Sequence, residues 1–91
     1  LNAVRWHTEA TDIAILVTGQ STDHLSAKLF HFGASARDMG ADLWRLTDGT
    51  RDWSLVCDDE PVAGGELSAG EPLSFALPSQ QLCVLTVGTM P

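Results

Sequence analysis

Pro72-Leu-Ser-Phe-Ala-Leu77 and Leu82-Cys-Val-Leu-Thr-Val87 are two short runs joined by Pro78-Ser-Gln-Gln81, near the end of the chain. In the first run apolar residues occupy every second position, which is the period of a strand with one face in a core. The second run is apolar on both faces, which predicts a central strand covered on both sides. Together they read as the closing hairpin of an antiparallel β-domain.

The rest of the chain repeats this pattern of short β-type runs broken by turns, and no stretch has a long helical period. The apolar run Ile13–Val17 predicts a buried central strand. A change of phase near Leu29 predicts a β-bulge, and Asp48-Gly49 predicts a hairpin. We expect a crossover between sheets over 34–39, the one segment where a helical turn could form, and an acidic, glycine-rich loop over 58–66. The predicted strands cover 4–8, 13–17, 24–32, 42–47, 51–57, 72–77 and 82–87.

These features predict an all-β fold, an antiparallel two-sheet β-sandwich of about seven short strands, because a single open sheet would leave one apolar face wet. The 91 residues fit one domain, 1–91. A small closed barrel is the alternative shape, and the pattern does not separate the two.

The charge balance bears on partners. Five Lys and Arg against twelve Asp and Glu give a formal charge of −7, and the cations are scattered. Such a chain is repelled by a phosphate backbone and by an anionic lipid surface, so we expect no nucleic-acid or membrane partner. No apolar run approaches the roughly 20 residues that cross a bilayer. The compartment is not indicated.

Three tryptophans, Trp6, Trp44 and Trp53, raise the possibility of sugar binding, since an indole face packs on the apolar face of a pyranose. Each has the phase of the more apolar side of its strand, which favours core packing instead. Trp44 and Trp53 flank the Asp48-Gly49 turn and are the candidate ligand-binding residues if one indole is exposed.

Catalytic and metal-binding patterns are weak. The histidines His7, His24 and His31 lack the spacing of zinc ligands, and Asp58-Asp59-Glu60 lacks the alternation of a calcium loop. The serine in Gly33-Ala-Ser-Ala-Arg37 lacks the context of a nucleophile elbow. We therefore predict no catalytic residue, no metal site and no cofactor.

The two cysteines, Cys57 and Cys83, are each in step with apolar neighbours. Buried free thiols are the default interpretation. A disulfide is possible if the two strands face each other across the core, and the sequence leaves this open.

The order of Ile13–Thr18, Ala41–Gly49 and Gly70–Val87 resembles the C-terminal β-sandwich that follows the (β/α)8 catalytic barrel in several glycoside hydrolase families. The shared features are an early apolar strand, a late alternating strand ending in Leu-Pro and a last strand that reads Val-Leu-Thr-Val. The resemblance implies a non-catalytic accessory domain, because the catalytic carboxylates of those enzymes reside in the barrel.

The sequence thus predicts an accessory module, not itself an enzyme, that stabilises or positions a neighbouring catalytic domain in the same chain. The start at Leu1-Asn2, without methionine, leads us to expect a piece of a longer polypeptide. Two alternatives stay open. One is a carbohydrate-binding module that uses an exposed tryptophan, and the other is a protein-interaction or adhesion sandwich that pairs through an edge strand.

Overall fold

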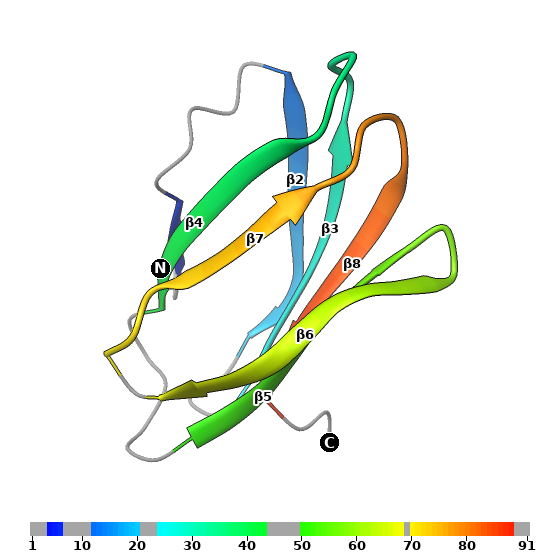
Figure 1. The fold of residues 1–91 in the computed structure, drawn as a ribbon. Helices are drawn as coiled ribbons and strands as arrows, with labels where there is room; N and C mark the ends of the chain where they lie inside the picture. Colours follow the sequence, from blue (N-terminus) through cyan, green and yellow to red (C-terminus); the bar gives the residue numbers. More distant parts are fainter. Residues whose placement is uncertain (1–3, 7–11, 21–23, 44–49, 69, 89–91) are drawn as a thin grey trace.

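The computed structural model describes residues 4–6, 12–20, 24–43, 50–68 and 70–88. All regular elements in these ranges are strands (Figure 1), and none of the described segments forms a helix that could span a membrane. The strands are β1 (Val4–Trp6), β2 (Ile13–Gln20), β3 (Leu25–His31), β4 (Arg37–Leu43), β5 (Thr50–Cys57), β6 (Glu60–Ser68), β7 (Leu73–Leu77) and β8 (Leu82–Val87).

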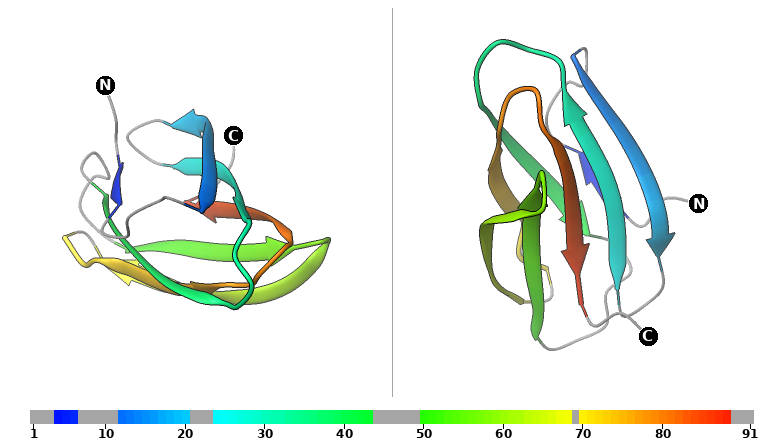
Figure 2. Two further views of the ribbon diagram at one scale, coloured as in Figure 1. Left: turned by 90° about the horizontal axis from the view of Figure 1, so that it is seen from above. Right: turned by 90° about the vertical axis from the view of Figure 1, so that its right-hand side faces the viewer.

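The strands form two antiparallel sheets, as predicted. One has five strands in the order β2-β3-β8-β5-β6, and the other has three in the order β1-β4-β7. In Figure 1, β4 and β7 cross in front of β2, β3 and β8, and Figure 2 shows the same arrangement from above and from the side. Seven of the strands have five residues or more, and β1 has three.

One hydrophobic core draws side chains from both sheets. The alternation predicted for 73–77 is confirmed, because Leu73, Phe75 and Leu77 of β7 are buried and the residues between them are exposed. They belong to the same buried cluster as Leu55 of β5 and Leu85 of β8. Full burial of a leucine side chain contributes about 2 kcal/mol, so this inner face dominates the stability.

The predicted closing hairpin is wrong. Strand β7 pairs with β4, whereas β8 pairs with β3 and β5 in the other sheet. The predicted Asp48-Gly49 turn lies outside the described residues, and the described strands before and after it, β4 and β5, belong to different sheets. The connection over 78–81 changes sheets because Gln80 donates its N–H to the carbonyl of His31 at 2.8 Å. Turn residues specify a reversal but not the sheet to which the next strand belongs.

The segment after β3 also differs from expectation. It crosses between the sheets as predicted, but Arg37–Met39 is the start of β4 and no helical turn forms there. The phase change near Leu29 is not a bulge, because from Ala27 to Phe30 strand β3 pairs residue by residue with both neighbours. His31 continues the buried face, and Phe30 and Phe32 lie on the opposite face. The irregularity is in β2, between Val17 and Gly19.

Strand β2 is an edge strand, whereas the run Ile13–Val17 predicted a central one. Its inner face carries Ile13, which is buried, and its outer face carries Leu16, which is 62% exposed. Strand β8 is central as predicted, but its outer face is not covered, since Leu82 is 49% exposed. Apolar residues on both faces therefore do not mean burial on both faces here.

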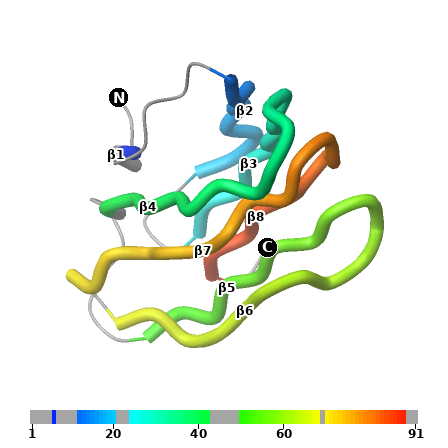
Figure 3. The backbone as a smooth tube through the Cα atoms, turned by 45° about the horizontal axis from the view of Figure 1, so that its top comes forward, coloured from blue at the N-terminus to red at the C-terminus, as the bar shows by residue number. Residues whose placement is uncertain are grey.

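Strand β6, which forms the opposite edge (Figure 3), was predicted to be a loop. Its residues Glu60, Pro61, Gly64 and Gly65 have low β-propensity, which hid the strand in the sequence. An edge strand tolerates them because only one side of its backbone must pair. Position 64 requires glycine, since a Cβ there would lie 2.9 Å from the backbone carbonyl oxygen of Trp53.

A disulfide joins Cys57 of β5 to Cys83 of β8, with Cα atoms 4.0 Å apart. The two are direct partners in neighbouring strands of one sheet and not across the core. The next pair along, Asp58 and Leu82, is hydrogen bonded at 2.9 Å, so the cysteines occupy the adjacent non-hydrogen-bonded site, where antiparallel Cα atoms approach closest. The default interpretation of free thiols is thus wrong.

Reduction of this disulfide should lower the free energy of unfolding by about 3 kcal/mol, because it frees a loop that the bridge closes in the unfolded chain. Urea unfolding followed by tryptophan fluorescence, with and without reductant, measures the change. A Cys57→Ala, Cys83→Ala double variant is the control, since reductant should not shift its midpoint. Equal midpoints for the wild-type chain in both conditions would contradict the prediction.

Candidate functional site

An apolar patch lies on the outer face of the five-stranded sheet, turned away from the core. We define the outer-face patch as Ala14, Leu16, Lys28, Phe30, Phe32 and Leu82. Phe32 is 60% exposed and stacks at a tilt on Phe30, with ring centroids 4.8 Å apart. Contiguous exposed apolar side chains of this kind mark interaction surfaces more often than isolated ones do.

A hollow of about 270 Å³ opens within the outer-face patch. Register places Phe30 of β3 directly opposite Ala14 of β2 on one side and Leu82 of β8 on the other. Lys28 is opposite Leu16. Because alanine is small, the space beside it on the sheet surface stays unfilled while the larger neighbours form the walls. The hollow can therefore receive an apolar side chain.

Among the described residues, Lys28 is the only charged one that lines this hollow, and it is the only lysine of the chain. Its side chain is exposed. A lysine keeps its ammonium group in water while its methylene stem covers apolar surface, so the patch combines apolar walls with one positive charge. In a chain with formal charge −7, this is a local exception to the negative surface.

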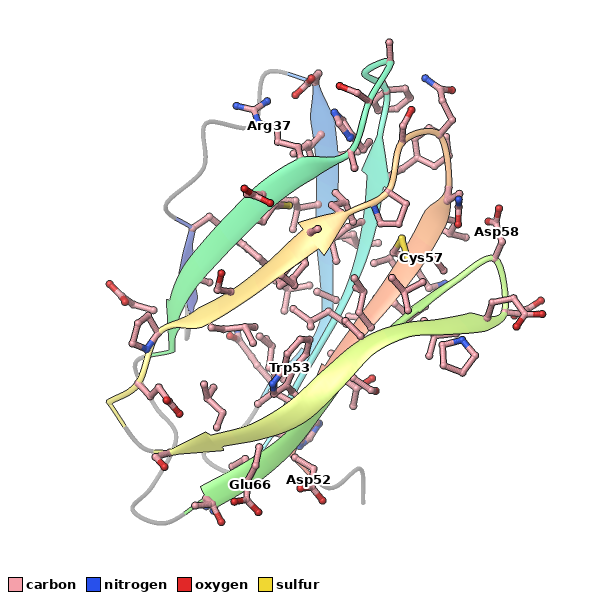
Figure 4. All side chains as sticks on the ribbon, in the orientation of Figure 1. Arg37, Asp52, Trp53, Cys57, Asp58 and Glu66 are labelled. Atoms are coloured by element: carbon pink, nitrogen blue, oxygen red, sulfur yellow. A yellow bond between two sulfur atoms is a disulfide. The ribbon has the colours of Figure 1, made fainter. Side chains whose placement is uncertain are left out.

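A second cluster lies at one end of the strands, where Asp12 bonds to residues of two other elements. His31 Nε2 at the end of β3 lies 3.2 Å from Asp12 Oδ2. Arg37 of β4 (Figure 4) donates from Nη1 to Asp12 Oδ1. Because β4 belongs to the three-stranded sheet, the carboxylate of Asp12 links the two sheets. A further hydrogen bond comes from the β7–β8 connection, where Ser79 Oγ donates to the Gly33 carbonyl at 2.6 Å.

The geometry of this cluster suits a structural role. His31 is 2% exposed, and its buried Nδ1 has no hydrogen-bond partner among the described residues. In the same part of the chain, neither ring nitrogen hydrogen bonds to a hydroxyl or thiol group of the kind that a catalytic histidine activates. Gly33 packs so closely that a Cβ there would lie 2.5 Å from His31 Nε2 and 2.8 Å from Asp12 Oδ2. Sequence reasoning missed the cluster because its members are far apart along the chain.

The pKa of Asp12 is lowered from its ordinary value of 3.8. Partial desolvation acts in the opposite direction and raises it, but the hydrogen bond from His31 and the charge of Arg37 outweigh that effect. The carboxylate therefore stays ionised and keeps both contacts across the neutral range.

The structure gives positions for one of the two tryptophans predicted to bind a ligand. Trp53 is half-buried and packs against the core, and its ring centroid lies 6.3 Å from that of Phe75 on β7 (Figure 4). Gly65 lies opposite Trp53 on β6. Trp44 lies outside the described residues, so the structure does not bring the two together. Trp6 also packs against the core.

The remaining polar candidates do not gather. Within the described ranges, no three side chains of His, Cys, Asp or Glu are grouped closely enough to hold a metal ion, and His7 lies outside those ranges. Asp58 and Asp59 are exposed and form the β5–β6 turn, with φ of 48° and 66°. Asp58 Oδ1 accepts a hydrogen bond from Leu82 N–H at 3.1 Å, so this carboxylate fixes the turn to β8.

Comparison of the chain with protein-family models, with curated proteins and with solved structures gives no match.

Replacing Gly33 with alanine should destabilise the fold by about 1–3 kcal/mol, because the new methyl group overlaps the His31–Asp12 contact. Gly19→Ala is the matched control, since a Cβ there has its nearest neighbour, His24 Nε2, at an ordinary 3.7 Å. Urea unfolding of both variants measures the difference. If the two substitutions had equal effects, the steric role of Gly33 would be refuted.

The acid dependence of stability tests the charge of Asp12. Because its pKa is lower in the folded chain, its ionisation stabilises the fold above its ordinary pKa, and this contribution is lost as the pH falls through the folded value. Asp12→Asn should therefore be less stable than the wild type at pH 7, and the gap should narrow below about pH 4. Urea midpoints across this range give the gap. A gap independent of pH would show that the charge is not involved.

Proposed function

We propose that this chain is a non-catalytic accessory β-sandwich module that packs through its outer-face patch on a neighbouring protein domain. The neighbour we propose is the catalytic domain of a larger carbohydrate-active enzyme, in the same polypeptide, which the module stabilises or positions. The observation that carries the proposal is the outer-face patch, in which Leu16, Phe32 and Leu82 are 62%, 60% and 49% exposed.

The sandwich assignment is supported by the single core that combines residues of both sheets. In a two-sheet sandwich the inner faces supply the core, and the outer faces are normally polar. Here the outer face of β5 and β6 follows that rule, with Asp52 and Glu66 exposed (Figure 4), whereas that of β2, β3 and β8 does not. Covering the outer face of β2, β3 and β8 would therefore give the largest gain in free energy from the burial of apolar surface.

The kind of neighbour is inferred from the resemblance to sandwiches that follow glycoside hydrolase barrels. A negative formal charge of −7 favours a protein neighbour over nucleic acid or an anionic membrane. Carbohydrate binding at Trp44 or Trp53 stays a prediction. The inward packing of Trp53 favours it less than the patch favours a protein neighbour.

Thermal unfolding of the full-length gene product tests the proposal. A Leu16→Glu, Phe32→Glu double variant should lower the unfolding temperature of the module within the full-length protein by several degrees, because two buried apolar contacts with the neighbour are replaced by charges. The same double variant of the isolated chain should change little, since both side chains are exposed there.

Val62→Glu is the control, because Val62 is also exposed, at 47%, but lies on β6 outside the patch. It should leave the unfolding temperature of the full-length protein unchanged. The proposal fails if the patch variant behaves like Val62→Glu in the full-length protein, or if the gene encodes no domain besides this one.

A further inference from the structure

Strand β2 has hydrogen-bonding groups on the side away from β3. The carbonyl of Asp12 accepts a hydrogen bond from the N–H of Phe32 at 2.8 Å, which fixes the phase of the β2–β3 ladder. In an antiparallel pair the bonded residues alternate, so Ala14 and Leu16 face β3 with their backbone groups. Ile13, Ile15 and Val17 therefore direct N–H and C=O groups outward, and among the described residues β2 pairs with β3 alone.

The side chains of this edge are incompletely covered on both faces. On the inner face Ile15 and Val17 are only half-buried, although they pack against the core. On the outer face Ala14 and Leu16 are exposed and border the hollow. A strand added beside β2 would bury apolar surface on both faces and would bond to the free backbone groups at the same time.

The charge of Lys28 and the net charge of the chain indicate which kind of segment could dock beside β2. Lys28 lies opposite Leu16 in the register, and none of the described residues that line the hollow carries a carboxylate. A second copy of this chain would bring a further charge of −7 to the contact, which opposes self-association. A segment with one carboxylate placed beside Lys28 satisfies the charge.

We propose that β2 is the docking edge for an extended segment of a protein partner, which adds to the sheet as a further antiparallel or parallel strand. The segment is apolar on both faces, places one apolar side chain in the hollow and carries one carboxylate beside Lys28. This inference rests on the proposed function and specifies how the neighbouring domain is held.

Hydrogen exchange of the isolated chain, measured residue by residue by NMR, tests the inference. The probe is a nine-residue peptide of valine, leucine and threonine with one central aspartate. Its binding should slow exchange at Ile13, Ile15 and Val17, whose N–H groups point outward. Exchange at Ala14 and Leu16, which already bond to β3, should change little.

A charge swap tests the part of Lys28. Lys28→Glu should weaken binding of the aspartate peptide about fivefold, the effect of an exposed ion pair. It should strengthen binding of the same peptide with lysine in place of aspartate. Leu16→Glu should weaken both peptides by obstructing the hollow, and Val62→Glu on β6 should change neither.

Three results would overturn the inference. They are uniform or absent protection along β2, affinities indifferent to the charge at position 28, and protection of the same amides that rises with protein concentration without peptide, which would identify a second copy as the occupant. The peptide experiment uses the isolated chain, so its failure would leave the unfolding-temperature test of the proposed function unaffected. Conversely, a full-length protein whose unfolding temperature does not respond to the patch variant would not explain why β2 stays unprotected when peptide is added.

Discussion

The antiparallel pairing that runs from β2 through β3 and β8 to β5 is the constraint on which the other features depend. It sends Leu29, Leu55 and Leu85 to the inner face, where they form the core with the three-stranded sheet. The same alternation brings Cys57 and Cys83 together at a non-hydrogen-bonded site. It also sends the other half of the apolar side chains outward, and these form the outer-face patch. Core, disulfide and patch are thus consequences of one ladder.

Much of the fold follows from the sequence because strand period and turn residues are local signals. The all-β class, the two antiparallel sheets and the inner face of β7 are all contained in alternation over a few residues. Strand pairing is not local. The β7–β8 connection looks like a hairpin turn, yet hydrogen bonds from Ser79 to Gly33 and from Gln80 to His31, the last residue of β3, direct the chain into the other sheet. Strand β6 escaped prediction because an edge position accepts Pro61 and paired glycines that a central strand excludes.

The apolar pattern of the candidate site is present in the sequence, but it predicted burial and not an exposed patch. The apolar residues at 14, 16, 30, 32 and 82 suggested strands covered twice and a bulge near Leu29, since burial is the usual reason for such residues. The structure keeps the phase, and no other described segment covers this face. The contact of Asp12 with His31 and Arg37 had no sequence signal, because its three members meet only once both sheets are in place.

The two edges of the five-stranded sheet differ in chemistry. Pro61 removes one backbone donor from β6, and Glu60 and Glu66 add like charges to the same strand. If β6 of one molecule could lie against β2 of the next, head-to-tail repetition would produce an open filament. The donor missing at the proline opposes that contact. It therefore weakens one end of such a repeat and makes polymerisation through the apolar β2 edge less favourable.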